Sequence, residues 1–90
     1  MKIIFTPQNI VFTKGFQKDF AKLETSDQNY IKEKLKKSFK YPEILSIKKL
    51  INYPYAQYRI KVRSFRLLFS VDIEKKKFLF SHCKHRKKLY

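Results

Sequence analysis

The apolar residues near the start of the chain fit a short strand followed by a helix. Ile10–Phe12 is a run of three apolar residues between polar neighbours, which predicts a short β-strand. From Lys14 to Leu23 the apolar residues recur three or four positions apart, which predicts a helix with one apolar face. The outward face of this helix would carry Lys18, Asp19 and Lys22.

A second helix is predicted directly after the first. Thr25 can cap its first turn, and Gln28 can reach back to the capping residue. An apolar stripe then continues at helical spacing to about Lys40, and Pro42 prevents the helix from continuing. Because only a short link separates the two segments, we expect a helical hairpin.

The second half of the chain has the pattern of successive strands. Its apolar runs predict strands over Tyr55–Val62, Phe65–Ile73 and Lys77–Cys83. The two residues Arg63–Ser64 and the charged segment Asp72–Lys76 are short enough to form hairpin turns. The predicted class is α+β, with the order β-α-α-β-β-β and a helical hairpin packed on an antiparallel sheet.

We expect residues 1–90 to form one domain, because a chain of this length has room for one core. Residues 1–8 would be an N-terminal arm, either an additional strand or a loose tail. Residues 42–54 connect the helical hairpin to the first long strand. The connector would be anchored to the core by its apolar residues Ile44, Leu45, Ile47, Leu50 and Ile51.

The segment Tyr58–Arg66 alternates apolar residues with cations. In a strand, Arg59, Lys61 and Arg63 would share the face opposite the core, and Arg66 would open the next strand. Cations so close together repel one another, so such a row is typical of a surface that binds a polyanion. The alternative is a solvated strand face that binds nothing.

The charge of the whole chain agrees with a polyanionic partner. Its 90 residues include 22 Lys and Arg but 7 Asp and Glu, a net charge of +15, although an AT-rich genome would also favour lysine. This indicates a nucleic acid or an acidic protein as partner. The charge is spread along the chain, which disfavours a membrane surface, and no apolar run reaches the roughly 18 residues of a transmembrane helix. The single Cys excludes an internal disulfide and fits the cytoplasm.

Several kinds of site are disfavoured. His82, Cys83 and His85 are the only His and Cys residues, and in a strand His82 would point away from the other two. We therefore expect no metal site, with Cys83 as a small core residue. The chain has one glycine and no phosphate-binding loop, so we expect no cofactor.

The cations and phenols remain, and they suit cleavage of RNA. That reaction needs a base for the 2′-OH, stabilisation of the charged phosphorane and a proton for the leaving 5′-oxygen. Arg66 suits the phosphate unless it pairs with Asp72 or Glu74 instead. A lysine acts as a base only when neutral, a form that neighbouring cations favour, and Lys61 lies among them. The leaving group would be assisted by His85 or Arg86 together with Tyr90, unless these are plain surface or packing residues. Tyr53, Tyr55 and Tyr58 suit either base stacking or core packing.

Three blocks of the sequence resemble those of the RelE/ParE toxin superfamily. The segment from Tyr58 to Asp72 resembles the block YRIRVGDYRLLYSVD. The segment from Lys84 to Tyr90 resembles the closing block GHRKDVY, and residues 10–23 resemble the opening block IxFSKxFxKDLKKL. The resemblance runs from about Asn9 to Tyr90, with the three blocks in the same order.

This resemblance implies a toxin of a type II toxin–antitoxin pair with a fold related to microbial ribonucleases. RelE-like members cleave mRNA in the ribosomal A site without a metal, leaving a 2′,3′-cyclic phosphate and a 5′-OH. The implied catalytic residues are Arg59, Lys61, Arg66, Arg86 and Tyr90. The residues expected to bind RNA or the ribosome are Lys48, Lys49, Arg63, Lys84, His85 and Lys87. The implied partners are a protein antitoxin with an acidic segment, the ribosome and mRNA, with operator DNA contacted only through the antitoxin complex.

The chain departs from the family pattern at some positions. Arg63 and Asn52 replace two usual glycines, and Asn tolerates positive φ. A related branch uses a Glu base in the connector, but Lys49 occupies that position here. Two alternatives stay open: a ParE-like member that inhibits DNA gyrase by binding, and a member that binds nucleic acid without cleaving it.

Overall fold

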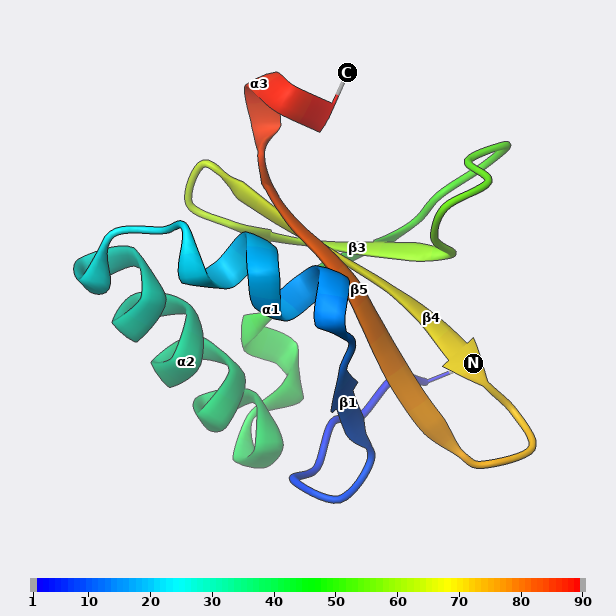
Figure 1. Cartoon of the computed structure of the whole chain (residues 1–90). Helices are drawn as coiled ribbons and strands as arrows, with labels where there is room; N and C mark the ends of the chain where they lie inside the picture. Colours follow the sequence, from blue (N-terminus) through cyan, green and yellow to red (C-terminus); the bar gives the residue numbers. More distant parts are fainter. Residues whose placement is uncertain (1, 90) are drawn as a thin grey trace.

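The computed structural model of the chain describes residues 2–89, apart from the side chain of residue 89. Figure 1 shows helices packed on a twisted sheet, so the predicted α+β class is confirmed. The elements in chain order are β1 (Ile10–Phe12), α1 (Lys14–Ala21), α2 (Thr25–Lys40), the 3-10 turn η1 (Pro42–Ile44), β2 (Ser46–Lys49), β3 (Tyr58–Val62), β4 (Phe65–Asp72), β5 (Lys77–His85) and α3 (Arg86–Leu89).

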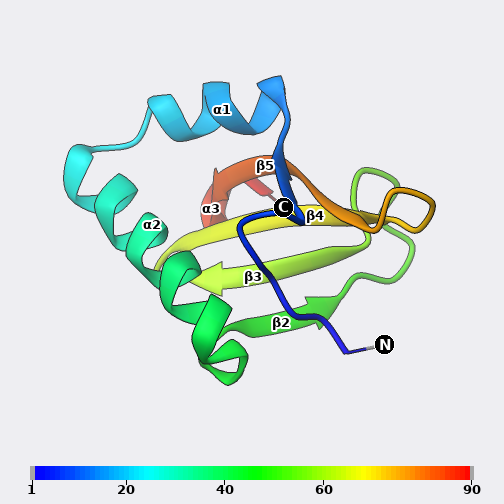
Figure 2. The ribbon, with the colours of Figure 1, turned by 90° about the horizontal axis from the view of Figure 1, so that it is seen from below.

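The strands form a single five-stranded sheet in the order β1-β5-β4-β3-β2. The β2–β3, β3–β4 and β4–β5 pairs are antiparallel, whereas β1 is parallel to β5. The three long strands are antiparallel as predicted, but the sheet as a whole is mixed, because β1 adds a parallel edge strand. Both helices of the hairpin lie along one side of the sheet (Figure 2).

Some predicted boundaries also change. The connector contains a strand that the sequence did not predict, β2, which pairs with β3 at the edge of the sheet. β3 begins at Tyr58 and not at Tyr55, because residues 50–57 form a loop. β5 continues to His85, and the basic segment after it begins the short helix α3. Ile51 is 83% exposed, so it does not anchor the connector as predicted.

Only the first helix of the hairpin begins with a side-chain cap. Thr13 caps α1 by accepting a hydrogen bond from the backbone N–H of Phe16. The predicted capping box at Thr25 was wrong, because Thr25 lies inside α2 and the N-cap residue is Glu24, with no side-chain bond. Gln28 instead donates to the carbonyls of Phe20 and Leu23 at the end of α1. Its amide thus joins the two helices.

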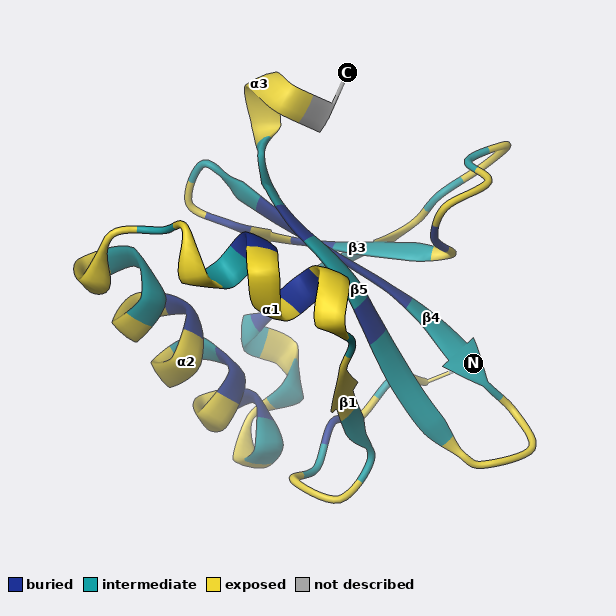
Figure 3. Ribbon diagram, in the orientation of Figure 1, coloured by how far each residue is buried: buried dark blue, intermediate teal, exposed yellow. Residues whose placement is uncertain are grey.

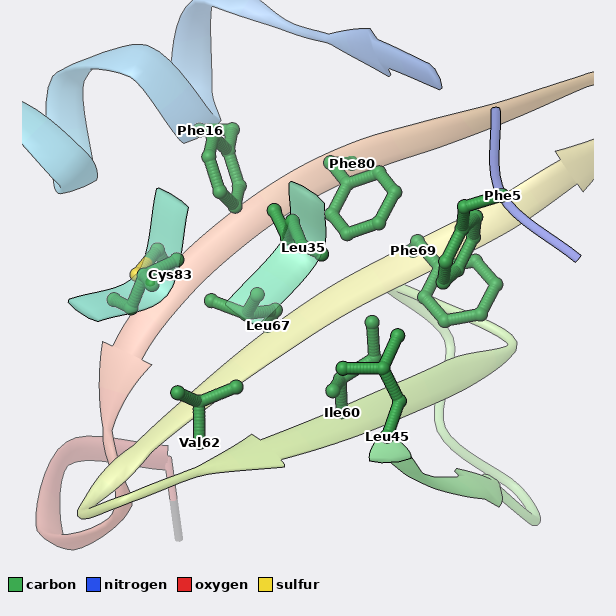
Figure 4. Packing of buried hydrophobic residues seen from close by; sticks show 11 residues of the cluster. Phe5, Phe16, Leu35, Leu45, Ile60, Val62, Leu67, Phe69, Phe80 and Cys83 are labelled. Carbon is green, nitrogen blue, oxygen red and sulfur yellow. The ribbon is translucent and has the colours of Figure 1, made fainter. Parts of the chain in front are cut away.

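The core fills the space between the helical hairpin and the sheet. Figure 3 shows the buried residues where α1 and α2 face the strands. At its centre Phe69 stacks on Phe80 with 5.2 Å between ring centroids, and Phe5 packs edge-on against Phe69 at 5.3 Å (Figure 4). Because Phe5 is only 1% exposed, it holds the N-terminal arm against the core, although residues 2–8 form no strand. None of the helices within residues 2–89 is long and apolar enough to cross a membrane.

Candidate functional site

Six basic residues lie on the sheet face that the helical hairpin does not cover. The strand registers align Ser46, Lys61, Arg66 and Lys84 in one row across β2, β3, β4 and β5. They align Lys48, Arg59, Leu68 and His82 in the next row. Because paired residues share a face, the basic side chains of both rows project together. We call this surface the basic face, and its members are Lys48, Arg59, Lys61, Arg66, His82 and Lys84.

The first row places three cations on adjacent strands. Arg66 lies opposite Lys61 on one side and opposite Lys84 on the other. Directly opposed residues have Cβ atoms only about 4.5–5.5 Å apart. One phosphate group can therefore contact more than one of these side chains. The two rows themselves contain no acidic residue, and the carboxylate that pairs with Lys84 is that of Asp19 on α1.

Arg66 is the buried member of the basic face, with 7% exposure. Its Nη1 donates to the carbonyls of Arg63 at 3.1 Å and Phe65 at 2.9 Å. These two bonds fix the guanidinium beside the β3–β4 turn. The alternative pairing of Arg66 with Asp72 or Glu74 is not among the ion pairs within residues 2–89. A fixed, partly desolvated guanidinium is well suited to hold an anion.

Asp19 of α1 anchors the β5 end of the basic face. Its carboxylate accepts a 3.1 Å hydrogen bond from the backbone N–H of Cys83 and a 2.8 Å bond from the Nζ of Lys84. The Nδ1 of His82 lies 3.7 Å from the same carboxylate. Since β1 pairs with β5 only as far as Phe80, Asp19 supplies the acceptor that a neighbouring strand would have supplied. One buried carboxylate thus fixes both the strand and the lysine.

The environment of Asp19 also determines its ionisation. Burial by itself would raise the pKa of Asp19. The hydrogen bonds from Lys84 and Cys83 and the electrostatic interactions with Lys84 and His82 outweigh burial, so the pKa of Asp19 lies below its ordinary value. The carboxylate is therefore charged at neutral pH. The prediction that Asp19 lies on the outward face of its helix was wrong, because Asp19 is only 9% exposed.

Two of the predicted binding residues point away from the basic face. Lys49 pairs with Tyr58, so its side chain lies on the other face of the sheet edge. Arg63 occupies the β3–β4 turn with a φ of 54°. Its guanidinium lies 3.6 Å from the carboxylate of Asp27 and 3.7 Å from the ring centroid of Tyr30, both on α2. Arg63 is therefore directed toward the helical side.

The predicted tail residues are also divided between surfaces. His85 pairs with Phe65 on the helical side of the sheet and contacts its ring edge-on at 5.6 Å. Arg86 and Lys87 are exposed in α3, and the backbone N–H of Arg86 donates to Ser64. Tyr90 lies outside the described residues. Within the described chain, Lys84 is the tail residue that aligns with Lys61 and Arg66.

A small hollow opens beside the two rows. Its volume is about 200 Å³, and it is lined by Tyr53, Tyr55, Leu68, His82, Lys84 and Lys88. Tyr53 and Tyr55 come from the loop between β2 and β3 and contact each other edge-to-face at 5.5 Å. Tyr58, by contrast, stacks on Phe69 in the core. The hollow therefore brings two surface phenols next to the basic face.

The histidines and the cysteine do not converge. His82 lies on the basic face, whereas Cys83 and His85 lie on the helical side, as strand alternation predicted. Within residues 2–89, no three His, Cys, Asp or Glu residues are placed to share a metal ion. Cys83 is 2% exposed, which confirms its place in the core, and burial followed by the charge of Asp19 raises its pKa to about 12.

The sequence did not indicate Asp19 or His82 as members of the site, and it indicated only a binding role for Lys84. Asp19 lies three positions after the buried Phe16, so the helical spacing itself could have indicated an inward position. The place of Lys84 opposite Arg66 depends on an irregularity between Leu68 and Phe69, for which the sequence carries no visible signal.

Comparisons with known proteins agree on the fold. No protein-family model matches the chain, and no curated protein matches it in sequence. It is similar to a RelB–RelE antitoxin–toxin complex from Methanococcus jannaschii, with a TM-score of 0.68 and 26% identity over 89% of this chain and 94% of that chain. It is similar to the toxin–antitoxin complex RelBE2 from Mycobacterium tuberculosis, with a TM-score of 0.67 and 20% identity over 87% and 96% of the two chains. It is also similar to an archaeal RelE–RelB complex from Pyrococcus horikoshii, with a TM-score of 0.65 and 20% identity over 87% and 93%.

Proposed function

We propose that the chain is a RelE-like toxin of a type II toxin–antitoxin pair, because its fold is similar to that of solved RelB–RelE complexes. We propose further that it is a ribosome-dependent endoribonuclease that cleaves mRNA in the A site without a metal or cofactor. The ribosome and mRNA are then its targets, and the cytoplasm is its site of action. The ParE-like alternative is not favoured, because the similar structures are RelB–RelE complexes.

The observation that carries the proposal is the row Lys61, Arg66 and Lys84. In-line attack on a phosphodiester places the entering and leaving oxygens on opposite sides of phosphorus. The row has a matching order, with a guanidinium at its centre and one lysine on either side. A solvated strand face would not need a buried arginine fixed by two carbonyls in the middle of the row.

Each member of the row has a role in the proposed reaction. Lys61 accepts the proton of the 2′-OH, whose oxygen then attacks phosphorus. Arg66, together with Arg59 in the next row, pairs with the phosphate oxygens and stabilises the added negative charge. The bond from phosphorus to the 5′-oxygen breaks, and Lys84 donates its proton to that oxygen. The products are a 2′,3′-cyclic phosphate and a 5′-OH.

The remaining predicted residues have supporting roles in this proposal. Lys48 extends the basic face along the next row, and Arg86 and Lys87 are exposed on α3, where they would contact RNA or ribosomal phosphates. For Tyr90 the proposed catalytic role rests on the sequence resemblance alone.

Cleavage in a cell-free translation reaction, located by primer extension, tests the proposal. We expect R66A to reduce the cleavage rate by about 10²–10³-fold, the usual effect of removing one donor to a developing anion. K61A and K84A should each reduce it by about 10²–10⁴-fold, as expected for a lost acid or base. K75A is the matched control, because Lys75 is exposed in the distant β4–β5 turn.

The competing assignments give different outcomes. If R86A loses more activity than K84A, the proton donor is at the start of α3 and the role of Lys84 is wrong. If the wild-type protein leaves ribosome-bound mRNA intact, the endoribonuclease is wrong. A parallel assay of supercoiling by DNA gyrase then tests the ParE-like alternative.

We also propose a protein antitoxin with an acidic segment that covers the basic face. The net charge of +15 and the absence of acidic residues in the two rows support this partner. In this proposal the toxin contacts operator DNA only through the antitoxin complex. Calorimetric titration at increasing salt should show a steep loss of affinity. An affinity that does not change with salt would contradict an interface led by charge.

A further inference from the structure

We propose that the hollow beside the basic face binds one nucleobase of the RNA, stacked against Tyr53 and Tyr55. The inference rests on the proposed RNA substrate, but it does not depend on cleavage. A volume of about 200 Å³ lies below the roughly 300–1,000 Å³ of pockets for whole small-molecule ligands. The hollow is therefore of a size for one flat ring and not for a complete cofactor.

The lining of the hollow has the chemistry that a nucleotide requires. Leu68, which is 1% exposed, closes it from the sheet side, and the two tyrosines add aromatic surface. Lys84 and Lys88 contribute positive charge to the same hollow, where a sugar–phosphate backbone would pass. Aromatic rings beside cations are the arrangement by which proteins hold single-stranded nucleic acid.

The tyrosines are presented by a loop that is fixed at both ends. The backbone N–H of Leu50 donates to the carbonyl of Gln57 at 2.8 Å, which closes the loop. Gln57 is bound in turn to β4, since its N–H donates to the carbonyl of Phe69 and its Oε1 accepts from the N–H of Val71. Ala56, 5% exposed, packs inward beside it.

The loop backbone also limits the conformations of the two rings. Pro54 lies between Tyr53 and Tyr55, so its ring fixes one φ angle and restricts the preceding residue to extended conformations. Tyr55 is 69% exposed, so its ring is accessible to a base. Fixing the rings in advance lowers the entropic cost of stacking a base.

The hollow shares Lys84 with the row that we propose for catalysis. A base in the hollow therefore belongs to a nucleotide next to the scissile phosphate. This contact would orient the RNA along the row, with Lys61 at the end away from the hollow. Tyr53 and Tyr55 are then positioning residues for the substrate and take no part in proton transfer.

Binding of a fluorescent hexanucleotide, measured by anisotropy, tests the inference. The probe is a 2′-O-methyl RNA hexamer, which cannot be cleaved by 2′-OH attack, so the result is independent of catalysis. We expect Y53L and Y55L each to weaken binding about tenfold, because stacking on an aromatic ring contributes about 1–3 kcal/mol per base. Y55F retains the ring and should bind within about twofold of wild type.

Two controls separate stacking from backbone contacts. Y41L replaces another exposed tyrosine, outside the hollow, and should bind the hexamer as wild type does. An abasic hexamer carries the same phosphates and should bind weakly and equally to wild type, Y53L and Y55L. The inference is overturned if the leucine variants bind the base-bearing hexamer as tightly as wild type, or if the abasic hexamer binds wild type equally well. Failure of ribosomal cleavage with normal base binding would instead reject only the catalytic proposal.

Discussion

Removing the carboxylate of Asp19 should destabilise the protein far more than removing an ordinary surface charge. In D19A the backbone N–H of Cys83 loses its acceptor in a buried position, which costs about 1–3 kcal/mol. The ion pair with Lys84, whose side chain is 41% exposed, adds no more than about 1 kcal/mol. We expect the free energy of unfolding to fall by about 2–3 kcal/mol.

Two further variants separate the contributions. D19N keeps an oxygen that can accept from Cys83 and loses only the charge, so we expect a loss below about 1 kcal/mol at neutral pH. D27A removes the carboxylate that pairs with Arg63, whose side chain is more exposed than that of Asp19. This change should also cost less than about 1 kcal/mol. Urea unfolding followed by circular dichroism measures all three. If D19A is no less stable than D27A, or if D19N loses as much stability as D19A, the Asp19 carboxylate is not the acceptor that stabilises β5.

The same residue should give the fold an acid sensitivity. Because the pKa of Asp19 is lower in the folded protein than its ordinary value of 3.8, its contribution is complete above that value. The contribution is lost as the pH falls through the lowered folded pKa. The free energy of unfolding should therefore decrease more steeply below about pH 4 in wild type than in D19N. If the free energy of unfolding falls with pH equally steeply in the two proteins, Asp19 is not the source of the acid sensitivity.

Three other outcomes follow from single positions. R63G should change the free energy of unfolding by less than about 1 kcal/mol in urea titrations, because relief of a 54° φ offsets the lost pair with Asp27. Cys83 should resist alkylation by iodoacetamide at mildly alkaline pH until urea unfolds the protein, because burial raises its pKa to about 12 and limits access of the reagent. Rapid labelling of the folded protein would refute this prediction. F5A should cost about 3–5 kcal/mol and I51A less than about 0.5 kcal/mol, so equal thermal stability of the two variants would show that the arm does not hold the core.

Most of the elements that the sequence predicted have a long repeating pattern, and β1, a run of three apolar residues, is the exception. The two helices and the three long strands each repeat an apolar spacing over several residues, so local pattern was sufficient. β2 has four residues, Ser46–Lys49, which is too short for alternation to be distinguished from a loop. The parallel pairing of β1 with β5 joins segments almost 70 residues apart in the sequence, and no local pattern encodes it.

The structure brings Lys61 and Arg66 together on one face but aligns Lys84 with them and not Arg86, for a specific physical reason. The β4–β5 register begins with Asp72 opposite Lys77, and counting from that pair would place Cys83 opposite Arg66. The irregularity between Leu68 and Phe69 adds one residue to β5, so Lys84 lies opposite Arg66 and Cys83 turns into the core. A shift of one residue exchanges the two faces of a strand. Lys84 therefore belongs to the basic face because of a bulge that no sequence pattern predicts.

The edges of the sheet bear on how this aromatic, strand-rich chain avoids aggregation. The outer strands are short, with three residues in β1 and four in β2, and β2 carries Lys48 and Lys49. Where β1 ends, the exposed flank of β5 is closed by α1 through Asp19. Short edges, edge lysines and a covering helix are three separate devices against growth of a sheet by addition of further chains. The carboxylate that orients a lysine on the basic face thus also occupies the N–H of Cys83, with which a strand of another molecule would otherwise pair.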